Sequence, residues 1–536
     1  MRTTTRSGAA VSANDERQDE VSAAEPEQES SVTSPSRRSF FFLGALAAAA
    51  VLPKRAAGQA VRRRRIAPAP DAPTSEPLAG IQPNEMVGAF AEWDSNGTRL
   101  VRRLTLGITP AEVQRVNSMG YQGYLNYQLN SSRIDDTTIE NVIAAKWPLM
   151  SQSSDTLFSA DAGQVQSQLR ESTLFRSAFS QRQLHQRMAE FWSDHFNQDI
   201  DKVGYLLVAD QRDVVRKNAL GKFSDLLKAS AHSASMMVYL DQNASRNTAP
   251  NQNYAREIME LHTLGVDGGY SQNDVAELSR VLTGWTVQGR GIFIFRPELH
   301  DWGSKTVMGV TIPAGSPSLG ADGIKEGEQM LDFLVSHPST ARFIATKMLK
   351  WLLTPSPSET QIAAVASAYR ATNGDIKAMV RAILNETWLP ASPMKLKRPF
   401  HYLVSAMRST NANVTTATAL SNSLTNLGQQ LYAWDTPDGY PDKIEYWAGN
   451  ILPRWSFATT MSNFNSATTV LVDTTAYRAG SPDAAVDLMD QNFFGGEMPL
   501  VTRNGLLSYL KAGTFNDTRV RETLALAMSA NAFQWY

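Results

Sequence analysis

The sequence predicts a mainly α fold, a large multi-helix domain with only short β segments. Apolar residues recur at helical spacing almost throughout the chain from Asn84 onward, which is typical of amphipathic helices that share a core. Strand-like patterns are confined to two short stretches, residues 292–296 and 306–312. With 536 residues, the chain is long enough to bury a large core.

The predicted helices follow one another with few interruptions. Thr109 followed by Pro110 is a helix start, because an N-cap residue precedes a proline in the first turn. Further amphipathic segments are expected over residues 163–196, 204–232, 325–353, 358–388, 396–408, 417–432 and 498–530. Residues 471–495 show weak periodicity and are predicted to be a loop with a short helix.

The first 60 residues have the pattern of an export signal. Residues 1–35 are polar and are expected to be disordered. Arg37 and Arg38 then precede an apolar run to Leu52, which fits a twin-arginine signal peptide cleaved near residues 57–60. The apolar run is about 13 residues long, shorter than an ordinary spanning helix. A short membrane anchor or a buried helix is the alternative.

Residues 61–83 hold four arginines and then a Pro/Ala-rich stretch, and are expected to link the signal to a helical domain over residues 84–536. The signal predicts a periplasmic or extracellular protein that touches a membrane only through the signal segment. Because the twin-arginine route carries folded proteins, often with a cofactor inserted, it is also a hint of a cofactor.

Composition excludes several classes of site and partner. The formal net charge of −1 gives no argument for a nucleic-acid partner or an anionic membrane. The chain has no cysteine, which excludes disulfides, thiolate zinc sites, iron–sulfur clusters, covalent c-type haem and cysteine nucleophiles. Any divalent metal must therefore be held by His, Asp, Glu, amide or carbonyl groups, and seven histidines are present.

Residues 251–285 predict two helices joined by a glycine-rich turn. The first is expected over residues 253–264, with Gly265 as its stop and positive φ at Gly268-Gly269. Ser271 and Asp274 have the spacing of a capping box that opens a second helix toward Thr283.

A helical wheel of residues 253–264 separates an apolar arc from a polar face. His262 lies nearly opposite the polar face, which consists of Asn253, Arg256, Glu257 and Glu260. One interpretation is a solvated surface with an Arg256–Glu260 ion pair. The other is a polar cavity in which Glu257 and Glu260 are metal ligands or acid/base groups.

Three other stretches carry chemistry-bearing residues. His195 lies in an apolar stripe, so it either bonds a backbone carbonyl in the core or faces the carboxylates of 253–264. Adjacent His300 and Asp301, with Lys305 near them, fit either an ion or polar-ligand site or a simple turn. The aromatic, turn-rich segment 432–441 fits a sugar-binding lip or a packed loop.

The chain resembles the bacterial "domain of unknown function 1800" family over nearly all of its length after the linker. The resemblance is carried by RRLTLGITPAEV at 102–113, FWSDHF at 191–196, YLDQNASR at 239–246, the segment NYAREIMELHTLGVDGGYSQNDVAELSRVLTGW at 253–285, HDWGSKTVMG at 300–309, HPSTARFIATKM at 337–348, KRPFHYLVSAMR at 397–408 and PDGYP at 437–441. Gln252 departs from the family, which usually has Glu at that place.

The resemblance implies export and, often, a neighbouring gene for an exported sulfatase-like protein of the "unknown function 1501" family. It implies no established activity. The recurring polar residues of the family correspond to His195, Asp241, Asn253, Arg256, Glu257, Glu260, Arg280, His300, Asp301 and Lys305 in this sequence. Polar residues that recur among apolar ones suggest a shared pocket.

Two hypotheses for function follow. The first is an exported hydrolase acting on an extracellular polymer or surface glycan, by metal-assisted or acid/base chemistry. Its expected catalytic residues are Glu257, Glu260 and His195; its ligand-binding residues are Arg256, Asn253, Lys305 and Arg280; and its metal ligands are His195, Glu257, Glu260, His300 and Asp301. The second hypothesis is a non-catalytic periplasmic binding or assembly protein for the sulfatase-like partner.

Overall fold

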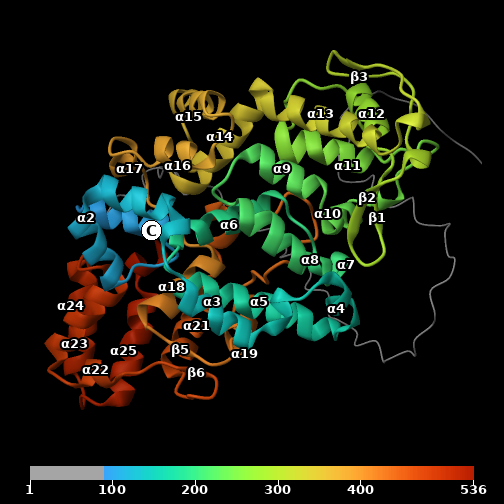
Figure 1. Cartoon of the computed structure of the whole chain (residues 1–536). Helices are drawn as coiled ribbons and strands as arrows, with labels where there is room; N and C mark the ends of the chain where they lie inside the picture. Colours follow the sequence, from blue (N-terminus) through green and yellow to red (C-terminus); the bar gives the residue numbers. More distant parts are fainter. Residues whose placement is uncertain (1–89) are drawn as a thin grey trace, which may run out of the picture. The chain divides into compact units, whose positions relative to one another are not determined.

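Helices dominate the structure. The computed structural model describes residues 90–536, in which 25 α-helices, nine shorter 3-10 or π-helical segments and three two-stranded antiparallel sheets follow one another (Figure 1). The predicted mainly α fold is confirmed. The predicted signal peptide and linker lie outside the described residues, which all belong to one compact unit. Among residues 90–536, no helix is long and apolar enough to cross a membrane.

The first helices gather around α6. They are α1 (Asn96–Leu104), α2 (Pro110–Leu129), η1 (Ser131–Arg133), α3 (Thr137–Lys146), η2 (Pro148–Ser151), α4 (Ser154–Ser159), α5 (Ala162–Phe179), α6 (Gln183–His195), α7 (Ile200–Val203), α8 (Leu206–Ala209), η3 (Asp210–Arg216), α9 (Phe223–Ala231), α10 (Ala234–Tyr239) and η4 (Gln242–Ala244). The predicted cap is present, since the Thr109 side chain accepts from the Glu112 N–H. Helix α6 contacts α1, α2, α5 and η3, and Trp192 within it is fully buried.

The middle of the chain holds the short β segments. Its elements are α11 (Gln252–Glu257), η5 (Ile258–Thr263), α12 (Gln272–Val281), β1 (Trp285–Gln288), β2 (Ile292–Phe295), η6 (Pro297–Leu299), β3 (Lys305–Val307), β4 (Val310–Ile312) and η7 (Pro317–Gly323). Strand β1 pairs with β2, and β3 with β4, both antiparallel. The two predicted β stretches are confirmed. Their partner β1 was not foreseen, because Trp285 follows directly on a helical pattern.

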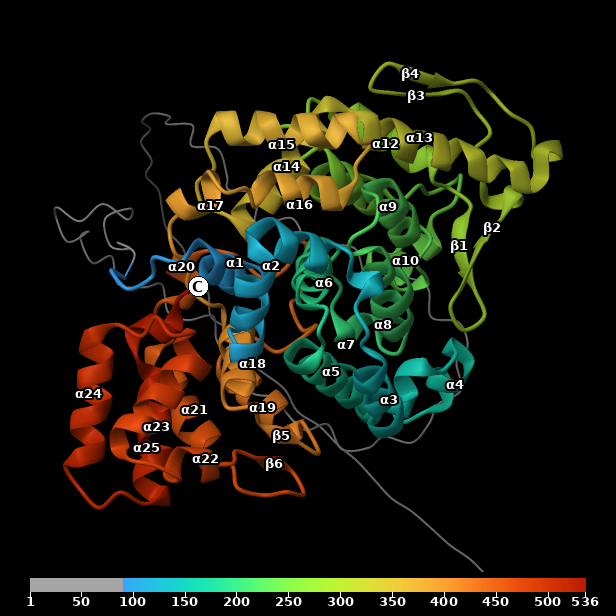
Figure 2. The same cartoon turned by 60° about the vertical axis from the view of Figure 1, so that its left-hand side comes forward.

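Helices α13 to α17 come next, coloured yellow to orange in Figure 2. They are α13 (Ile324–Ser336), α14 (Pro338–Leu352), α15 (Glu359–Ala371), α16 (Ile376–Ile383) and α17 (Trp388–Ala391). Helix α14 packs against α13, α15 and α16, and also against η5, so it brings its residues beside the 252–263 segment.

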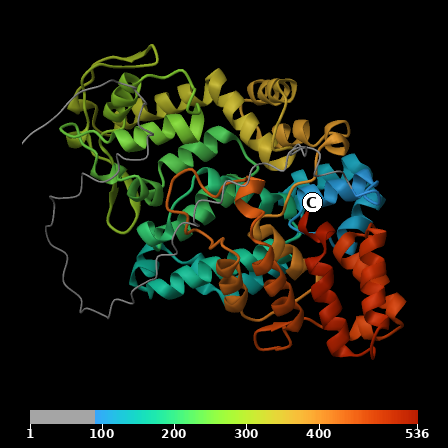
Figure 3. The same cartoon turned by 180° about the vertical axis from the view of Figure 1, so that it is seen from behind.

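The last part of the chain is a further set of helices, orange to red in Figure 3. It consists of α18 (Pro399–Ser409), β5 (Asn413–Val414), α19 (Thr418–Asn426), α20 (Ile444–Trp447), α21 (Ile451–Asn463), β6 (Val470–Leu471), α22 (Thr475–Arg478), α23 (Pro482–Met489), η8 (Asp490–Phe494), α24 (Leu500–Lys511), α25 (Asp517–Ser529) and η9 (Asn531–Gln534). The prediction that 471–495 is mostly loop is wrong. Its helices are too short to show a clear period, and burial of Val486, Met489 and Phe493 stabilises them.

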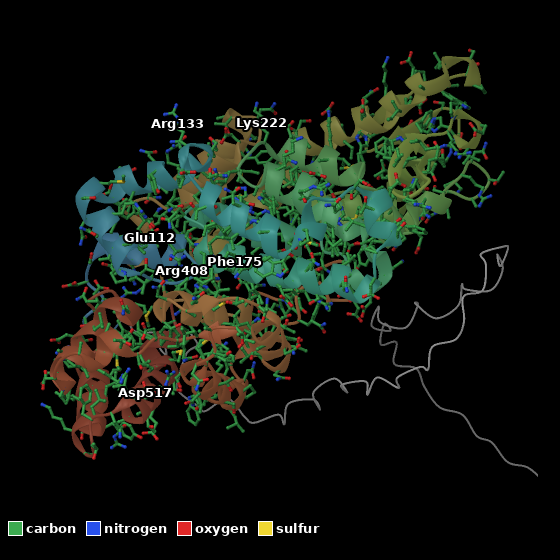
Figure 4. All side chains as sticks on the ribbon, turned by 60° about the horizontal axis from the view of Figure 1, so that its bottom comes forward. Glu112, Arg133, Phe175, Lys222, Arg408 and Asp517 are labelled. Atoms are coloured by element: carbon green, nitrogen blue, oxygen red, sulfur yellow. The ribbon has the colours of Figure 1, made fainter. Side chains whose placement is uncertain are left out.

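Two hydrophobic clusters form the core. One is built mainly from residues before α18 and the other mainly from α18 onward, with additions from α3 and α5. Every residue of α18 is buried, so this helix is enclosed on all sides. The Arg408 guanidinium of α18 bonds the carbonyls of Gly107 and Ala178. Figure 4 shows Arg408 in the interior with Glu112 and Phe175, whereas Arg133 projects at the surface.

Candidate functional site

Local sequence signals set the backbone of the 251–281 segment. The Asn251 side chain caps α11, and the predicted Ser271–Asp274 capping box opens α12. The chain widens into the π-helical η5, where the Leu264 N–H donates to the Met259 carbonyl at 2.8 Å. Gly265 ends the segment with a φ of +83°, as predicted.

The turn after η5 differs from the prediction at one glycine. Gly269 has positive φ, but Gly268 does not. Glycine is required at 268 for a different reason, because a Cβ there would lie 2.3 Å from the Leu264 Cβ.

Glu257 is a nearly buried carboxyl group without a partner. Its residue is 9 % exposed, and it forms no hydrogen bond or ion pair with any residue between 90 and 536. Burial raises the pKa of Glu257 to about 7; the charges of Glu260 and Asp438 add to the rise, and Arg256 opposes it. The predicted Arg256–Glu260 ion pair does not form, since the Arg256 Nη2 donates to Gln272 at 2.8 Å and Glu260 accepts from the Tyr270 hydroxyl.

Lys347 of α14, which the sequence did not point to, also feels the charge of Asp438. Burial lowers the pKa of Lys347 to about 8, although Asp194 and Asp438 raise it. Within the described chain its ammonium makes no hydrogen bond or ion pair, and lies 5.5 Å from the Phe343 ring centroid. An unpaired lysine and an unpaired glutamate that both respond to Asp438 are typical of a functional site. Lys347 and Asp438 lie in two of the family-like segments, 337–348 and 437–441, and this resemblance is the sequence signal that could have identified them.

Asp438 is held by the aromatic loop 432–441. It accepts from Trp434 Nε1 at 3.2 Å and from the Thr436 hydroxyl at 2.5 Å. The Trp434 ring lies 4.9 Å from that of Tyr440 and 6.0 Å from that of Tyr446, which is half exposed. An aromatic cluster therefore lies beside the Asp438 carboxylate.

The same loop is fixed to α10 and to the segment that follows α6. The Asn197 amide donates to the carbonyls of Trp434 and Thr436 at 2.9 and 2.7 Å, and the Tyr239 hydroxyl donates to the carbonyl of Asp435. A loop with these anchors is a rigid support for the groups it carries.

His195 is buried as predicted, but it belongs to the core. Its ring lies 5.3 Å from that of Trp192, and Nε2 contacts the His262 carbonyl at 3.1 Å. Burial lowers its pKa well below the usual range, so the ring is neutral. The structure therefore shows the backbone-carbonyl arrangement and gives no contact between His195 and the carboxylates of α11 and η5.

The predicted residues around His300 form a separate, fully partnered network. Arg280 binds Asp301 through two nitrogens and also binds Glu277. The buried Lys305 ammonium pairs with Glu326 and bonds the Asp301 carbonyl. His300 contacts the Thr283 carbonyl through Nδ1 and Glu326 through Nε2, at 2.7 and 3.2 Å. Because its charged groups are already matched, this network anchors the loop before β3 to α12 and α13.

The expected metal ligands are not gathered at one place. Within residues 90–536, no group of three or more His, Asp or Glu side chains is placed to hold a metal ion. Two other residues of the family pattern have structural contacts. The Asn253 N–H donates to the Asn251 cap of α11, and Asp241 is exposed and paired with Lys202. The candidate site on the polar face of α11 and η5 therefore has no set of three such ligands among residues 90–536.

Replacing Glu257 by glutamine should stabilise the protein at neutral pH. Below pH 4.5, the ordinary pKa of glutamate, the Glu257 carboxyl is protonated in both the folded and the unfolded protein. Between pH 4.5 and about 7 the unfolded chain loses this proton first, so this contribution to stability falls as pH rises. The variant should lack the resulting penalty of about 3 kcal/mol. Urea unfolding at pH 4.5 and pH 8 measures the difference in free energy of unfolding between the variant and the parent. The variant Glu445→Gln, at an exposed position, is the control. A variant less stable than the parent at pH 8 would refute an unpaired Glu257.

Comparison with known proteins identifies one relationship. No curated protein matches the chain, and no solved structure matches it either. The family described as "Protein of unknown function (DUF1800)" matches residues 99–535, a range that contains Glu257, Lys347 and Asp438. Since the match covers most of the sequence, the chain belongs to this family.

Proposed function

We propose that this protein is an acid/base hydrolase that acts on an extracellular polymer or surface glycan. The observation that carries the proposal is the unpartnered Glu257 carboxyl group, whose pKa of about 7 suits proton transfer at neutral pH. The export pattern at Arg37-Arg38 supports a substrate outside the cytoplasm.

The neighbouring residues support distinct roles in hydrolysis. Protonated Glu257 would donate its proton to the leaving oxygen, while Glu260 would orient or deprotonate the attacking water. Lys347, protonated at neutral pH, would hold an anionic group of the substrate. The sequence predicts Lys305 as a ligand-binding residue, but Lys305 is already neutralised by Glu326. Trp434 would stack on a sugar face.

A matched pair of variants tests the proposal. The purified exported chain, Glu257→Gln and Glu445→Gln would be incubated with nitrophenyl glycosides, nitrophenyl esters and dye-labelled cell-wall polysaccharides. We expect hydrolysis of at least one substrate, reduced about 100-fold or more by Glu257→Gln and unchanged by Glu445→Gln. Hydrolysis that survives in Glu257→Gln would remove this residue from the mechanism, and no turnover of any substrate would count against an enzyme.

One surface favours the second candidate function, an assembly protein for an exported partner. Helix α21 exposes Ile451, Leu452 and Trp455, which are 53, 71 and 52 % accessible. A cluster of large apolar side chains on a surface is typical of a protein contact. If the sulfatase-like protein is the partner, Leu452→Glu should abolish a complex between the two purified proteins. Glu257→Gln should leave that complex intact, whereas an undisturbed complex in Leu452→Glu excludes this surface.

A further inference from the structure

A cavity of about 290 Å³ lies between α3, α5, α6, η3 and the 429–440 loop. Neither Glu257 nor Lys347 lines it, so it is distinct from the proposed acid/base site. Helix α5 packs against α3 and α6, and α6 packs against η3 (Figure 1). The volume is near the lower end of the range of small-molecule sites.

The cavity has an apolar body with a mouth at one side. Its wall includes the buried side chains of Ile143, Trp147, Leu169, Val208 and Phe400. Its lining also includes two solvent-exposed residues, Ala144 of α3 and Ser151 of η2, so the opening lies at these elements. A ligand could enter there without unfolding the surrounding helices.

Most charges of the cavity wall cancel one another. Arg176 binds Glu140 through two nitrogens, at 2.9 and 2.8 Å. Arg398 pairs with Glu190 and Asp194. Arg212, near the mouth, pairs with its neighbour Asp213.

Arg216 is the exception among the cavity arginines. Its Nη1 donates to the Gln186 amide oxygen at 2.8 Å, but it forms no ion pair with any carboxylate of residues 90–536. Burial lowers the pKa of Arg216 to about 9; the charge of Arg176 adds to the fall, and the charges of Glu140, Tyr432 and Asp136 oppose it. Arg216 is half-buried and its other guanidinium nitrogens have no partner in the described part of the chain, so a ligand carboxylate can bind there and supply the opposite charge.

The backbone beside Arg216 is strained. Tyr432, which also lines the cavity, has a φ of +61°, a conformation that non-glycine residues rarely adopt. Its hydroxyl lies 2.9 Å from that of Thr173, and its carbonyl accepts from the Ile200 N–H. Strain retained by several contacts often marks a binding site.

We propose that this cavity binds a small organic monocarboxylate with an apolar body, whose carboxylate pairs with Arg216. A guanidinium can donate two parallel hydrogen bonds to a carboxylate, which gives both charge neutralisation and orientation. The apolar wall then covers the remainder of the ligand. A neutral molecule of the same shape would leave Arg216 without a counterion, and a cation would add to the positive charge.

Calorimetric titration with matched probes tests this inference. Acetate, hexanoate and benzoate would be compared with hexanamide and benzamide, on the parent protein and on three variants. Arg216→Gln removes the charge, Lys217→Gln makes the same charge change at the exposed neighbouring position, and Ala144→Trp blocks the mouth with an exposed substitution. Circular dichroism and melting temperature establish that each variant is folded.

We expect hexanoate or benzoate to bind at least 10-fold more tightly than its amide. Arg216→Gln and Ala144→Trp should each weaken that binding at least 10-fold, and Lys217→Gln should not change it. Equal affinity for acid and amide would mean an apolar cavity without anion recognition and would overturn the proposal. The proposal would also be overturned if none of the carboxylates bound at about 10 mM, since weaker binding would not be specific. If Arg216→Gln fails to fold, Ala144→Trp still decides whether the carboxylate enters this cavity.

Discussion

Replacing Arg398 by methionine should lower the free energy of unfolding by about 3–5 kcal/mol, the usual cost of leaving buried charges unpaired. Arg398 is 4 % exposed and binds Glu190 at 2.5 Å and Asp194 at 2.7 Å. Its guanidinium also lies 4.5 Å from the Trp351 ring centroid. Methionine fills much of the same space but leaves two carboxylates without their shared cation.

The loss should depend on pH in a defined direction. Burial already raises the pKa of Asp194 to about 6, against the attraction of Arg398. Without Arg398 the carboxyl is expected to hold its proton more tightly in the folded state, so acid conditions relieve the repulsion with Glu190. Unfolding in guanidinium chloride should therefore show that Arg398→Met loses less free energy of unfolding at pH 5 than at pH 8. Arg381→Met, an exposed position, is the control, and a deficit below 1 kcal/mol at pH 8 would contradict a tightly coupled charge network.

The fold class was predictable because it depends on local signals. Thr109, Ser271 and Gly265 mark helix ends through caps and backbone conformation, and these effects need no tertiary information. Segments whose helices are short, such as 471–495, were not predictable. Their stability comes from contacts with α24 and α25 rather than from a period in their own residues.

The site was only partly predictable for a physical reason. The wheel predicted that Glu257 and Glu260 lie close together, and the charge of Glu260 acts on Glu257, because residues one helical turn apart are neighbours. The charge of Asp438, from a later loop, acts on both Glu257 and Lys347, and no local pattern reports this proximity. Asp194 and His195 are adjacent in sequence, but the first lines the cavity and the second lies in the core. Whether each polar group finds a partner is decided by tertiary packing.

The turn at Gly439 carries residues of both proposed sites, and a substitution there is the second change expected to have a large effect on stability. Gly439 has a φ of +76°, and a Cβ at this position would lie 2.2 Å from the Asp194 carbonyl oxygen. Asp438 acts on Glu257 from one side of the turn, while Tyr440 lines the cavity from the other. Any substitution at Gly439 must therefore move the turn away from α6.

Gly439→Ala should lower the free energy of unfolding by about 3 kcal/mol or more, of which positive φ accounts for about 1–2 kcal/mol. Gly428→Ala is the matched control, because Gly428 has a φ of +87° with no atom within 4 Å of its Cβ position. Urea unfolding of both variants isolates the clash from the backbone strain. Since the displaced turn carries Asp438 and Tyr440, Gly439→Ala should also weaken carboxylate binding and shift the pKa of Glu257 downward, as measured by the pH dependence of stability. Equal stability losses in the two variants would show that the turn can withdraw from Asp194 without cost, which would contradict the predicted clash.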